Sequence, residues 1–173
     1  MEIDYQSCLN EIYEETKGLL GKGKVADYIP ALAEVDPNQY GICVHTLEGQ
    51  TFYVGDAKTP FSIQSISKVF ILSMVFAALG DSIWSRMGRE PSGSSFNSLV
   101  LLETENGKPR NPFINAGALV TTDCLLSISK NPLKDILNFV RSLAKNKYGN
   151  YDSVGANSEM EAYFRNAALL NFM

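Results

Sequence analysis

The sequence has few of the residues on which metal sites and histidine-based triads depend. Its 173 residues include a single histidine, His45, and three cysteines, an odd number without the spacing of a zinc site or a redox pair. The net charge is −4, and no run of Lys or Arg offers a surface to phosphate groups. We therefore expect no metal, no cofactor and no nucleic-acid partner.

Long hydrophobic runs are scarce as well. The longest covers Val69–Leu79 with one interruption at Ser73, which is shorter than the roughly 20 residues that cross a bilayer. Residues 1–15 are acidic and amphipathic, and they lack the basic start and apolar centre of a secretory signal. The sequence thus predicts a cytoplasmic protein with reduced thiols and no membrane partner.

The composition is that of a folded chain. Apolar residues make up 45% of the sequence and charged residues 20%, which suits one globular domain with a sizeable core. β-Branched and aromatic residues on both sides of Gly49 predict a β-hairpin from residues 41–47 and 51–55. Helical spacing of apolar residues predicts helices over 5–20, 29–33, 65–79, 115–129 and 133–145, with a last helix from 158 onward.

Three segments support more specific predictions. The helix over 65–79 is apolar nearly all round, which indicates a buried central helix. Ser158, followed by Glu161, predicts a capping box at the start of the last helix. The loop region over 88–112 is rich in Gly, Pro, Ser and Asn, and within it Leu99–Leu102 predicts a short strand.

An S-x-x-K motif, Ser65 to Lys68, opens the apolar helix. Residues three apart lie on one helical face. A serine hydroxyl is a weak nucleophile until a neighbouring base takes its proton, and a lysine can be that base when burial lowers its pKa. The same motif marks the nucleophile of β-lactamases and penicillin-binding proteins. The motif therefore predicts Ser65 as nucleophile and Lys68 as its proton acceptor.

Other interpretations of these residues stay open. Short S-x-x-K matches arise by chance, in which case Ser65 or Ser67 caps a helix and Lys68 is solvated. A Ser-His-Asp triad would need His45 beside Ser65, although a strand residue is the simpler role for that histidine. Cys43 and His45 lack a third orienting partner for a papain-like pair, and Cys43 is expected in the core.

Four longer segments occur in the order found in serine-dependent glutaminases, and the chain resembles that family over about residues 22–172. They are G-K-V-A-D-Y-I-P at 23–30, F-S-I-Q-S-I-S-K at 61–68, G-R-E-P-S-G at 88–93 followed by Phe96-Asn97, and N-P-F-I-N-A-G-A at 111–118. The resemblance implies a mixed α/β fold of the α+β kind, with a β-lactamase/transpeptidase-like sheet beside a helical subdomain. It also implies cofactor-free hydrolysis of L-glutamine to L-glutamate and ammonia.

The resemblance implies roles for individual residues. Ser65 matches the nucleophile and Lys68 the base. Glu159 matches a residue that binds the α-amino end of the substrate. The residues matched to substrate binding or pocket lining are Tyr28, Gln64, Ser65, Asn115, Glu159 and Asn166.

Simple chemistry agrees with two of these roles. Glutamine carries an α-ammonium group, which needs a carboxylate, and an α-carboxylate, which needs hydrogen-bond donors. Glu159 and Asn166 are seven residues apart, or two helical turns, so a continuous helix would place both on one face. Alternatively, Glu159 only favours a helix N-terminus and Asn166 is solvated. Asn115 has the alternative of capping a helix after Pro112.

The resemblance also implies that residues 1–173 form an incomplete catalytic domain that lacks a C-terminal part. That part carries two tyrosines of the site and a Gly-rich K-S-G segment with a donor of the oxyanion hole, which can change the rate by about 10²–10³. Without it we expect an exposed sheet edge, an uncovered face on the central helix and little or no activity. For the full-length protein, the resemblance implies a homodimer or homotetramer.

Two rival functions fit part of the same pattern. A penicillin-binding or β-lactamase-like acyltransferase would share the S-x-x-K chemistry, but the glutaminase segments favour glutamine as the substrate. A truncated, non-catalytic subunit that co-assembles with a full-length paralogue is the second rival.

Overall fold

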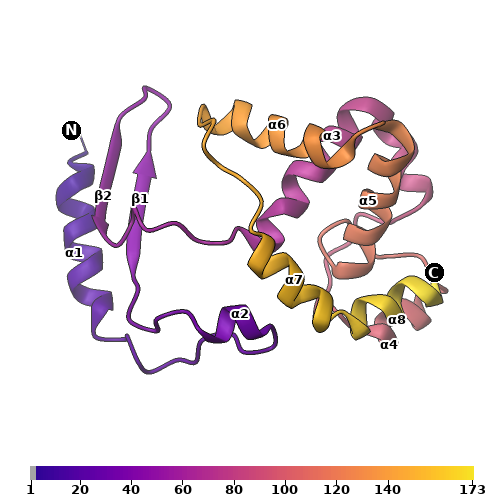
Figure 1. The fold of residues 1–173 in the computed structure, drawn as a ribbon, viewed down its shortest axis with the longest axis horizontal. Helices are drawn as coiled ribbons and strands as arrows, with labels where there is room; N and C mark the ends of the chain where they lie inside the picture. The colour runs from indigo at the N-terminus through magenta and orange to yellow at the C-terminus, as the bar shows by residue number, and fades with distance from the viewer. Residues whose placement is uncertain (1–2) are drawn as a thin grey trace. The chain divides into compact units, whose positions relative to one another are not determined.

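The computed structural model describes residues 3–173 (Figure 1). The chain forms two compact units, of which the first contains Met1–Ser62 with Val154–Glu159 and the second contains Ile63–Ser153 with Met160–Met173. The mixed α/β composition expected from the sequence is confirmed, with helices predominating and one two-stranded sheet among the described residues.

The first unit contains a helix packed on a β-hairpin (Figure 1). Asp4 begins the helix by accepting a hydrogen bond from the Ser7 backbone N–H at 3.0 Å. The hairpin is antiparallel, with Cys43 opposite Tyr53, and it confirms the prediction from the β-branched and aromatic residues on both sides of Gly49. The elements of this unit before Ser62 are α1 (Tyr5–Lys17), α2 (Pro30–Ala33), β1 (Gly41–His45) and β2 (Thr51–Gly55).

The two faces of the hairpin differ because side chains alternate along a strand. Ile42, Val44, Phe52 and Val54 are half-buried, and Phe52 lies 5.5 Å from the ring of Tyr5 on α1. The opposite face is exposed and carries Cys43, His45, Thr51 and Tyr53. Cys43 is therefore not a core residue, contrary to expectation, since the hairpin has a covering helix on one face only.

The capping box predicted at Ser158 is wrong. Helix α7 (Ser153–Glu161) begins five residues earlier, so Ser158 lies inside it. The Ser158 hydroxyl instead accepts a hydrogen bond from the backbone N–H of Ala31 at 3.0 Å. This contact joins α7 to α2 within the first unit, and it uses the Ser158 oxygen that the capping box would have required.

Helices form the second unit, and two apolar clusters hold them together. The elements are η1 (Gln64–Ile66), α3 (Ser67–Leu79), η2 (Gly80–Ser85), α4 (Leu99–Thr104), α5 (Asn115–Ile128), α6 (Pro132–Ala144) and α8 (Phe164–Phe172), together with the end of α7. The first cluster lies between α3, η2 and α5, and its fully buried members are Val75, Ile83, Met87, Val120, Cys124 and Leu125.

The second cluster joins α4, α5 and α8. Leu102, Ile114, Ala116 and Leu169 are its buried residues. Leu99–Leu102, predicted as a strand, belongs to helix α4, whose first turn is capped by the Ser98 hydroxyl accepting from the Leu101 backbone N–H at 3.2 Å. The prediction failed because a short apolar run does not distinguish a strand from a short helix.

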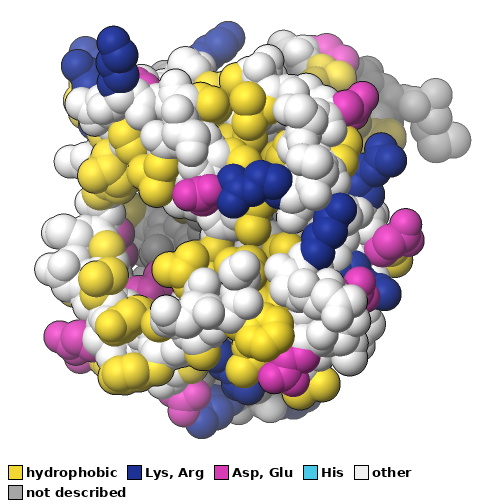
Figure 2. All heavy atoms as spheres, turned by 90° about the vertical axis from the view of Figure 1, so that its right-hand side faces the viewer, with side chains coloured by type: hydrophobic (Ala, Val, Ile, Leu, Met, Phe, Trp, Pro, Cys, Tyr) yellow, Lys and Arg dark blue, Asp and Glu magenta, His cyan; other side chains and the backbone are white. Residues whose placement is uncertain are grey.

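Helix α3 is less buried than its composition predicted. Only Val75 is fully buried, while Val69 and Phe76 keep 49% and 44% of their surface exposed. One side of the helix packs on α5 and α6, and no described element covers the other side to the same degree. Large apolar side chains are exposed elsewhere too, and Figure 2 shows them interspersed with charged side chains on one face.

The helical stretch around α3 is longer than the apolar run in the sequence. The turns η1 and η2 extend it to Gln64–Ser85, which is 22 residues and meets the length and composition of a membrane span. The length predicted from the apolar run Val69–Leu79 was therefore too short, because that run leaves out both turns. The core helix of a soluble protein meets the same criterion, so the stretch alone does not identify a membrane protein.

Candidate functional site

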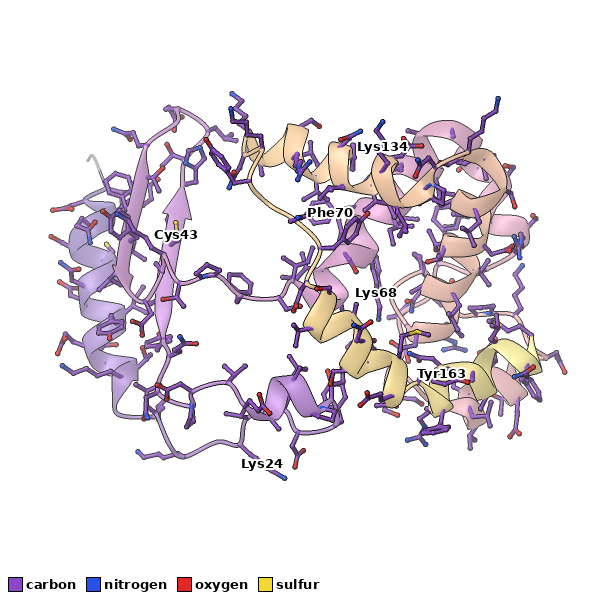
Figure 3. All side chains as sticks on the ribbon, viewed as in Figure 1. Lys24, Cys43, Lys68, Phe70, Lys134 and Tyr163 are labelled. Carbon is purple, nitrogen blue, oxygen red and sulfur yellow. The ribbon has the colours of Figure 1, made fainter. Side chains whose placement is uncertain are left out.

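Lys68 lies near the start of α3 (Figure 3) and donates two hydrogen bonds to carbonyl oxygens. Its Nζ lies 3.0 Å from the backbone oxygen of Phe113 and 2.8 Å from Oδ1 of Asn115. The side chain is half-buried, and its Nζ is 5.9 Å from the centroid of the Phe96 ring. A charged lysine donates hydrogen bonds and accepts none, so these oxygens fix the position of its head group.

The Phe113 carbonyl is held by a turn at Asn111. The Asn111 side-chain oxygen accepts from the backbone N–H groups of Phe113 at 2.9 Å and Ile114 at 3.1 Å. Its side-chain nitrogen donates to the backbone oxygen of Glu90 at 2.8 Å. An Asx turn of this kind sets the backbone direction just before a helix, and here it orients the oxygen that receives Lys68.

Gly117 lets this turn approach α5 closely. A Cβ atom at Gly117 would lie only 1.8 Å from the backbone oxygen of Asn111. Any residue with a side chain would therefore push the turn away from the helix. Gly117 is buried in the first turn of α5, so the contact is part of the packed interior.

Asn115 joins Lys68 to a third helix. Its side-chain nitrogen donates to Oδ1 of Asn166 on α8 at 3.0 Å. Lys68 requires an acceptor, so the Asn115 oxygen must face it and the Asn115 amide nitrogen must face Asn166. The same logic turns the Asn166 oxygen toward Asn115. The chain of donors therefore ends on the Asn166 amide nitrogen, whose N–H groups suit a carbonyl or carboxylate oxygen.

Ser65 lies in the turn η1, immediately before α3. It is exposed, and it precedes Lys68 by three residues in a continuous helical stretch. Capping does not explain it, because the residue at the N-cap of α3 is Ile66 and makes no side-chain capping bond. Ser67 is not a cap either, since it is the first residue of α3.

Gln64 precedes Ser65 with an unusual backbone conformation. Its φ angle is 44°, in the left-handed region that residues with a side chain seldom adopt. Such conformations cost about 1–3 kcal/mol and concentrate at functional sites.

A cavity of about 400 Å³ shares two of its lining residues with the surroundings of Lys68, although Lys68 itself does not line it. It is lined by residues of α3, η2 and the two loops before α5, and Phe96 and Phe113 belong both to this lining and to the surroundings of Lys68. On another part of the wall, the Arg89 guanidinium lies 5.5 Å from the Trp84 ring. The lining of this cavity thus combines aromatic and apolar side chains with a few polar and charged ones.

The other predicted site residues lie in the first unit. Tyr28 is 70% exposed and precedes α2. Glu159 is exposed on α7, next to Ser158, whose hydroxyl contacts α2 through Ala31. The structure therefore brings the segments of Tyr28 and Glu159 together, and separately brings together Lys68, Asn115 and Asn166.

The prediction that Glu159 and Asn166 share one helical face is wrong. Helix α7 ends at Glu161 and α8 begins at Phe164, so the two residues lie on different helices. The spacing argument assumed an unbroken helix. Asn115 is likewise not a cap, because Ile114 occupies the N-cap of α5 and Asn115 is the first helical residue.

The alternative catalytic groups lie elsewhere. The Nδ1 atom of His45 is 2.8 Å from the hydroxyl of Thr51, its partner across the hairpin, as expected for an ordinary strand residue. Cys124 is buried, and its sulfur accepts from Arg86 at 3.4 Å. Among residues 3–173, no three His, Cys, Asp or Glu side chains gather as a metal site would require.

The sequence and fold match known glutaminases. The sequence model of the family described as Glutaminase matches residues 23–173. The glutaminase of Agrobacterium fabrum is 53% identical over 172 residues, which cover 98% of this chain and 56% of that protein. The glutaminase of Pseudoalteromonas translucida is 52% identical over 170 residues, covering 98% and 55%. The chain therefore spans a little over half the length of these curated relatives.

Solved structures agree with the sequence comparison. The probable glutaminase YbaS superposes with a TM-score of 0.90 at 30% identity, covering 98% of this chain and 56% of that one. The probable glutaminase from Bacillus subtilis, solved with 6-diazo-5-oxo-L-norleucine, gives a TM-score of 0.79 at 30% identity, covering 100% and 54%. The fold is thus that of the solved glutaminases. The chain belongs to the glutaminase family.

Several contributors to the site were not assigned from the sequence. Phe113 acts through its backbone oxygen, and Asn111 acts through that backbone. Both lie in the N-P-F-I-N-A-G-A segment, which signals the site as a whole. Nothing in the identity of residue 113 shows that its carbonyl would accept Lys68, because any residue offers the same oxygen.

Proposed function

We propose that this chain carries the nucleophile and base of an amidohydrolase that converts L-glutamine and water to L-glutamate and ammonia. The observation that carries the proposal is the pair of carbonyl oxygens around Lys68, at 3.0 Å from Phe113 and 2.8 Å from Asn115. A neutral amine has two N–H groups and one lone pair. When both N–H groups are donated to these oxygens, the lone pair is directed away from them and can accept a proton.

In the proposed reaction, the Ser65 oxygen attacks the side-chain amide carbon of glutamine. Lys68 accepts the Ser65 proton and then delivers it to the departing nitrogen, which leaves as ammonia. The product of this half-reaction is an ester between Ser65 and the γ-carboxyl group. Water then hydrolyses the ester, with Lys68 again accepting a proton, and Ser65 is restored as glutamate leaves. The donor of an oxyanion hole would stabilise both tetrahedral intermediates.

For substrate recognition we propose the polar groups already described. The Asn166 amide nitrogen ends the chain of hydrogen bonds from Lys68 and would donate to a carboxylate or carbonyl oxygen of glutamine. Glu159 would bind the α-ammonium group, while Tyr28, Gln64 and Asn115 would border the substrate. The diazoketone amino acid bound by the Bacillus subtilis relative has the α-amino acid head group that such a site requires.

We also propose that the protein works in the cytoplasm, that its complete form is a homo-oligomer, and that residues 1–173 alone have little or no turnover. Ser65 is exposed and Lys68 only half-buried, whereas a lysine base needs a dry environment to hold a neutral amine at pH 7. A non-catalytic subunit that assembles with a full-length paralogue remains the second candidate, because the chain spans little more than half the length of its relatives.

Covalent labelling tests the nucleophile without requiring turnover. The chain is incubated with 6-diazo-5-oxo-L-norleucine, and the adduct is mapped by mass spectrometry. We expect modification of Ser65 that is lost in Ser65→Ala, strongly slowed in Lys68→Met and retained in the control Ser67→Ala. An adduct with a β-lactam instead would favour the acyltransferase alternative. Absence of any adduct on Ser65 would favour a non-catalytic subunit.

A further inference from the structure

An ion pair joins the end of α4 to the loop that precedes α5. Both Nε and Nη2 of Arg110 bind the same carboxylate oxygen of Glu105, at 2.8 Å and 2.6 Å. Glu105 is the C-cap of α4, and the second apolar cluster holds that helix in place. Among the ion pairs of residues 3–173, this pair has the least exposed side chains. The pair therefore attaches the loop to a packed helix.

The backbone between the two charged residues turns back on itself. Asn106 and Gly107 both have positive φ angles, 53° and 79°, and the N–H of Gly107 donates to the backbone oxygen of Leu102 at 2.9 Å. This turn returns the chain toward the end of α4, where Arg110 meets Glu105. The ion pair thus closes a loop of six residues and sets where the loop ends.

Arg110 also takes part in a junction of backbone hydrogen bonds. Its backbone oxygen accepts from the N–H of Glu90 at 3.1 Å, and the oxygen of Pro109 accepts from the N–H of Gly88 at 2.8 Å. An added Cβ at Gly88 would lie 2.6 Å from the Arg110 oxygen, so the two segments are in close contact. A displacement of Arg110 would therefore disturb both of them.

This junction leads directly to the oxygen that receives Lys68. Asn111 follows Arg110, and its side chain accepts from the backbone N–H of Phe113 at 2.9 Å. The Phe113 oxygen in turn accepts from Lys68 at 3.0 Å. Three planar peptide units connect Arg110 to Phe113, and the ring of Pro112 fixes one of the intervening φ angles. A shift of the Arg110 backbone would therefore move the Phe113 oxygen.

We propose that Glu105 and Arg110 are positioning residues for Lys68, because their ion pair holds the Phe113 oxygen where it accepts one N–H of the lysine. The role is geometric. An ion pair with partly exposed side chains contributes little to stability, whereas two N–H groups on one carboxylate oxygen fix the direction of the guanidinium group. The positioning of Lys68 does not depend on the proposed function, but its effect on the reaction of Ser65 rests on that function.

Lysine acetylation tests the positioning without requiring turnover. Arg110→Lys removes the guanidinium fork and Glu105→Asp shortens the carboxylate by one methylene, and both keep the net charge. The native chain is treated with trace acetic anhydride, and each modified lysine is quantified by mass spectrometry. We expect Lys68 to react about threefold faster or more in both variants, because a lost carbonyl partner frees the amine and no longer favours its charged form. The exposed Lys134 and Lys145 are internal references.

Two control variants separate geometry from charge and from general loosening. Glu105→Gln removes the charge but keeps the length and the accepting oxygen, so it should leave the acetylation of Lys68 within about twofold of the parent rate. Glu14→Asp shortens the carboxylate of another ion pair, Glu14 with Lys17 on α1, and should leave Lys68 unaffected. Because the Glu105–Arg110 pair is partly exposed, Tm should stay within about 4 °C of the parent value in Arg110→Lys and Glu105→Asp.

The diazoketone reaction measures the chemical consequence. Labelling of Ser65 by 6-diazo-5-oxo-L-norleucine should slow about tenfold in Arg110→Lys and Glu105→Asp, because the lone pair of Lys68 is no longer aimed. Three results would overturn the positioning role: unchanged acetylation of Lys68 in both variants, an equal increase in Glu14→Asp, or faster acetylation of all lysines together with a larger fall in Tm. Faster acetylation of Lys68 alone, in a protein whose parent chain forms no adduct on Ser65, would leave the positioning intact and contradict the proposed function.

Discussion

The replacement of Gly117 by alanine tests how the candidate site is built. In the structure, an added Cβ would lie 1.8 Å from the backbone oxygen of Asn111 and 2.8 Å from Cα of Pro112. Ordinary contacts need about 3.4 Å or more, so the turn must move by roughly 1.5 Å. If the turn moves that far away from the added Cβ, the 3.0 Å hydrogen bond from Lys68 to the Phe113 oxygen breaks.

The expected magnitude follows from opposing effects. Alanine favours a helix over glycine by about 1 kcal/mol, whereas overpacking a buried contact costs typically about 1–3 kcal/mol and sometimes more. Each hydrogen bond of the turn that is lost adds about 1 kcal/mol to this cost. We therefore expect Gly117→Ala to lower the free energy of unfolding by about 2 kcal/mol, which is a fall of about 4–8 °C in Tm for a chain of this size.

Thermal and urea unfolding measure this effect directly. Gly18→Ala is the control, because Gly18 has a right-handed helical conformation and no heavy atom within 4 Å of an added Cβ. The control should be neutral or slightly stabilising. A Gly117→Ala protein as stable as the parent chain would refute the close approach of the Asn111 turn to α5, and with it the explanation given for the position of the Phe113 carbonyl.

Three further predictions follow from local geometry. Asn111→Ala should slow diazoketone labelling of Ser65 by about tenfold or more, because the turn that aims the Phe113 oxygen at Lys68 is lost; an unchanged labelling rate would show that the turn does not position Lys68. Hydrogen bonds from Ser7 hold the pKa of the Asp4 carboxyl below its ordinary value of 3.8, so its capping contribution is present above that pH and is lost as the pH falls through the lowered pKa. Acid titration of helix content should show this loss for the parent chain and not for Asp4→Ala. A thiol reagent should modify the exposed Cys8 and Cys43 rapidly in the native chain, and the buried Cys124 only after unfolding. Fast modification of all three cysteines would contradict the burial of Cys124.

The local elements were largely predictable from sequence. The hairpin follows from the β-branched and aromatic residues on both sides of Gly49. The helices α5 and α6 follow from apolar spacing, with ends within one residue of the predicted ones. Local rules failed where a residue's partner is distant in sequence. Ser158 has a capping pattern, yet its hydroxyl bonds to Ala31, which is 127 residues away.

The candidate site shows the same division. The S-x-x-K motif and the family resemblance selected Lys68, Asn115 and Asn166 from sequence alone, because side chains with distinct chemistry leave a recognisable pattern. Three features depended on the tertiary structure: the oxygen of Phe113 as a partner of Lys68, the break between α7 and α8, and the exposed side of α3. Backbone oxygens are alike at every residue, and the exposure of an apolar helix depends on which other elements are present to cover it.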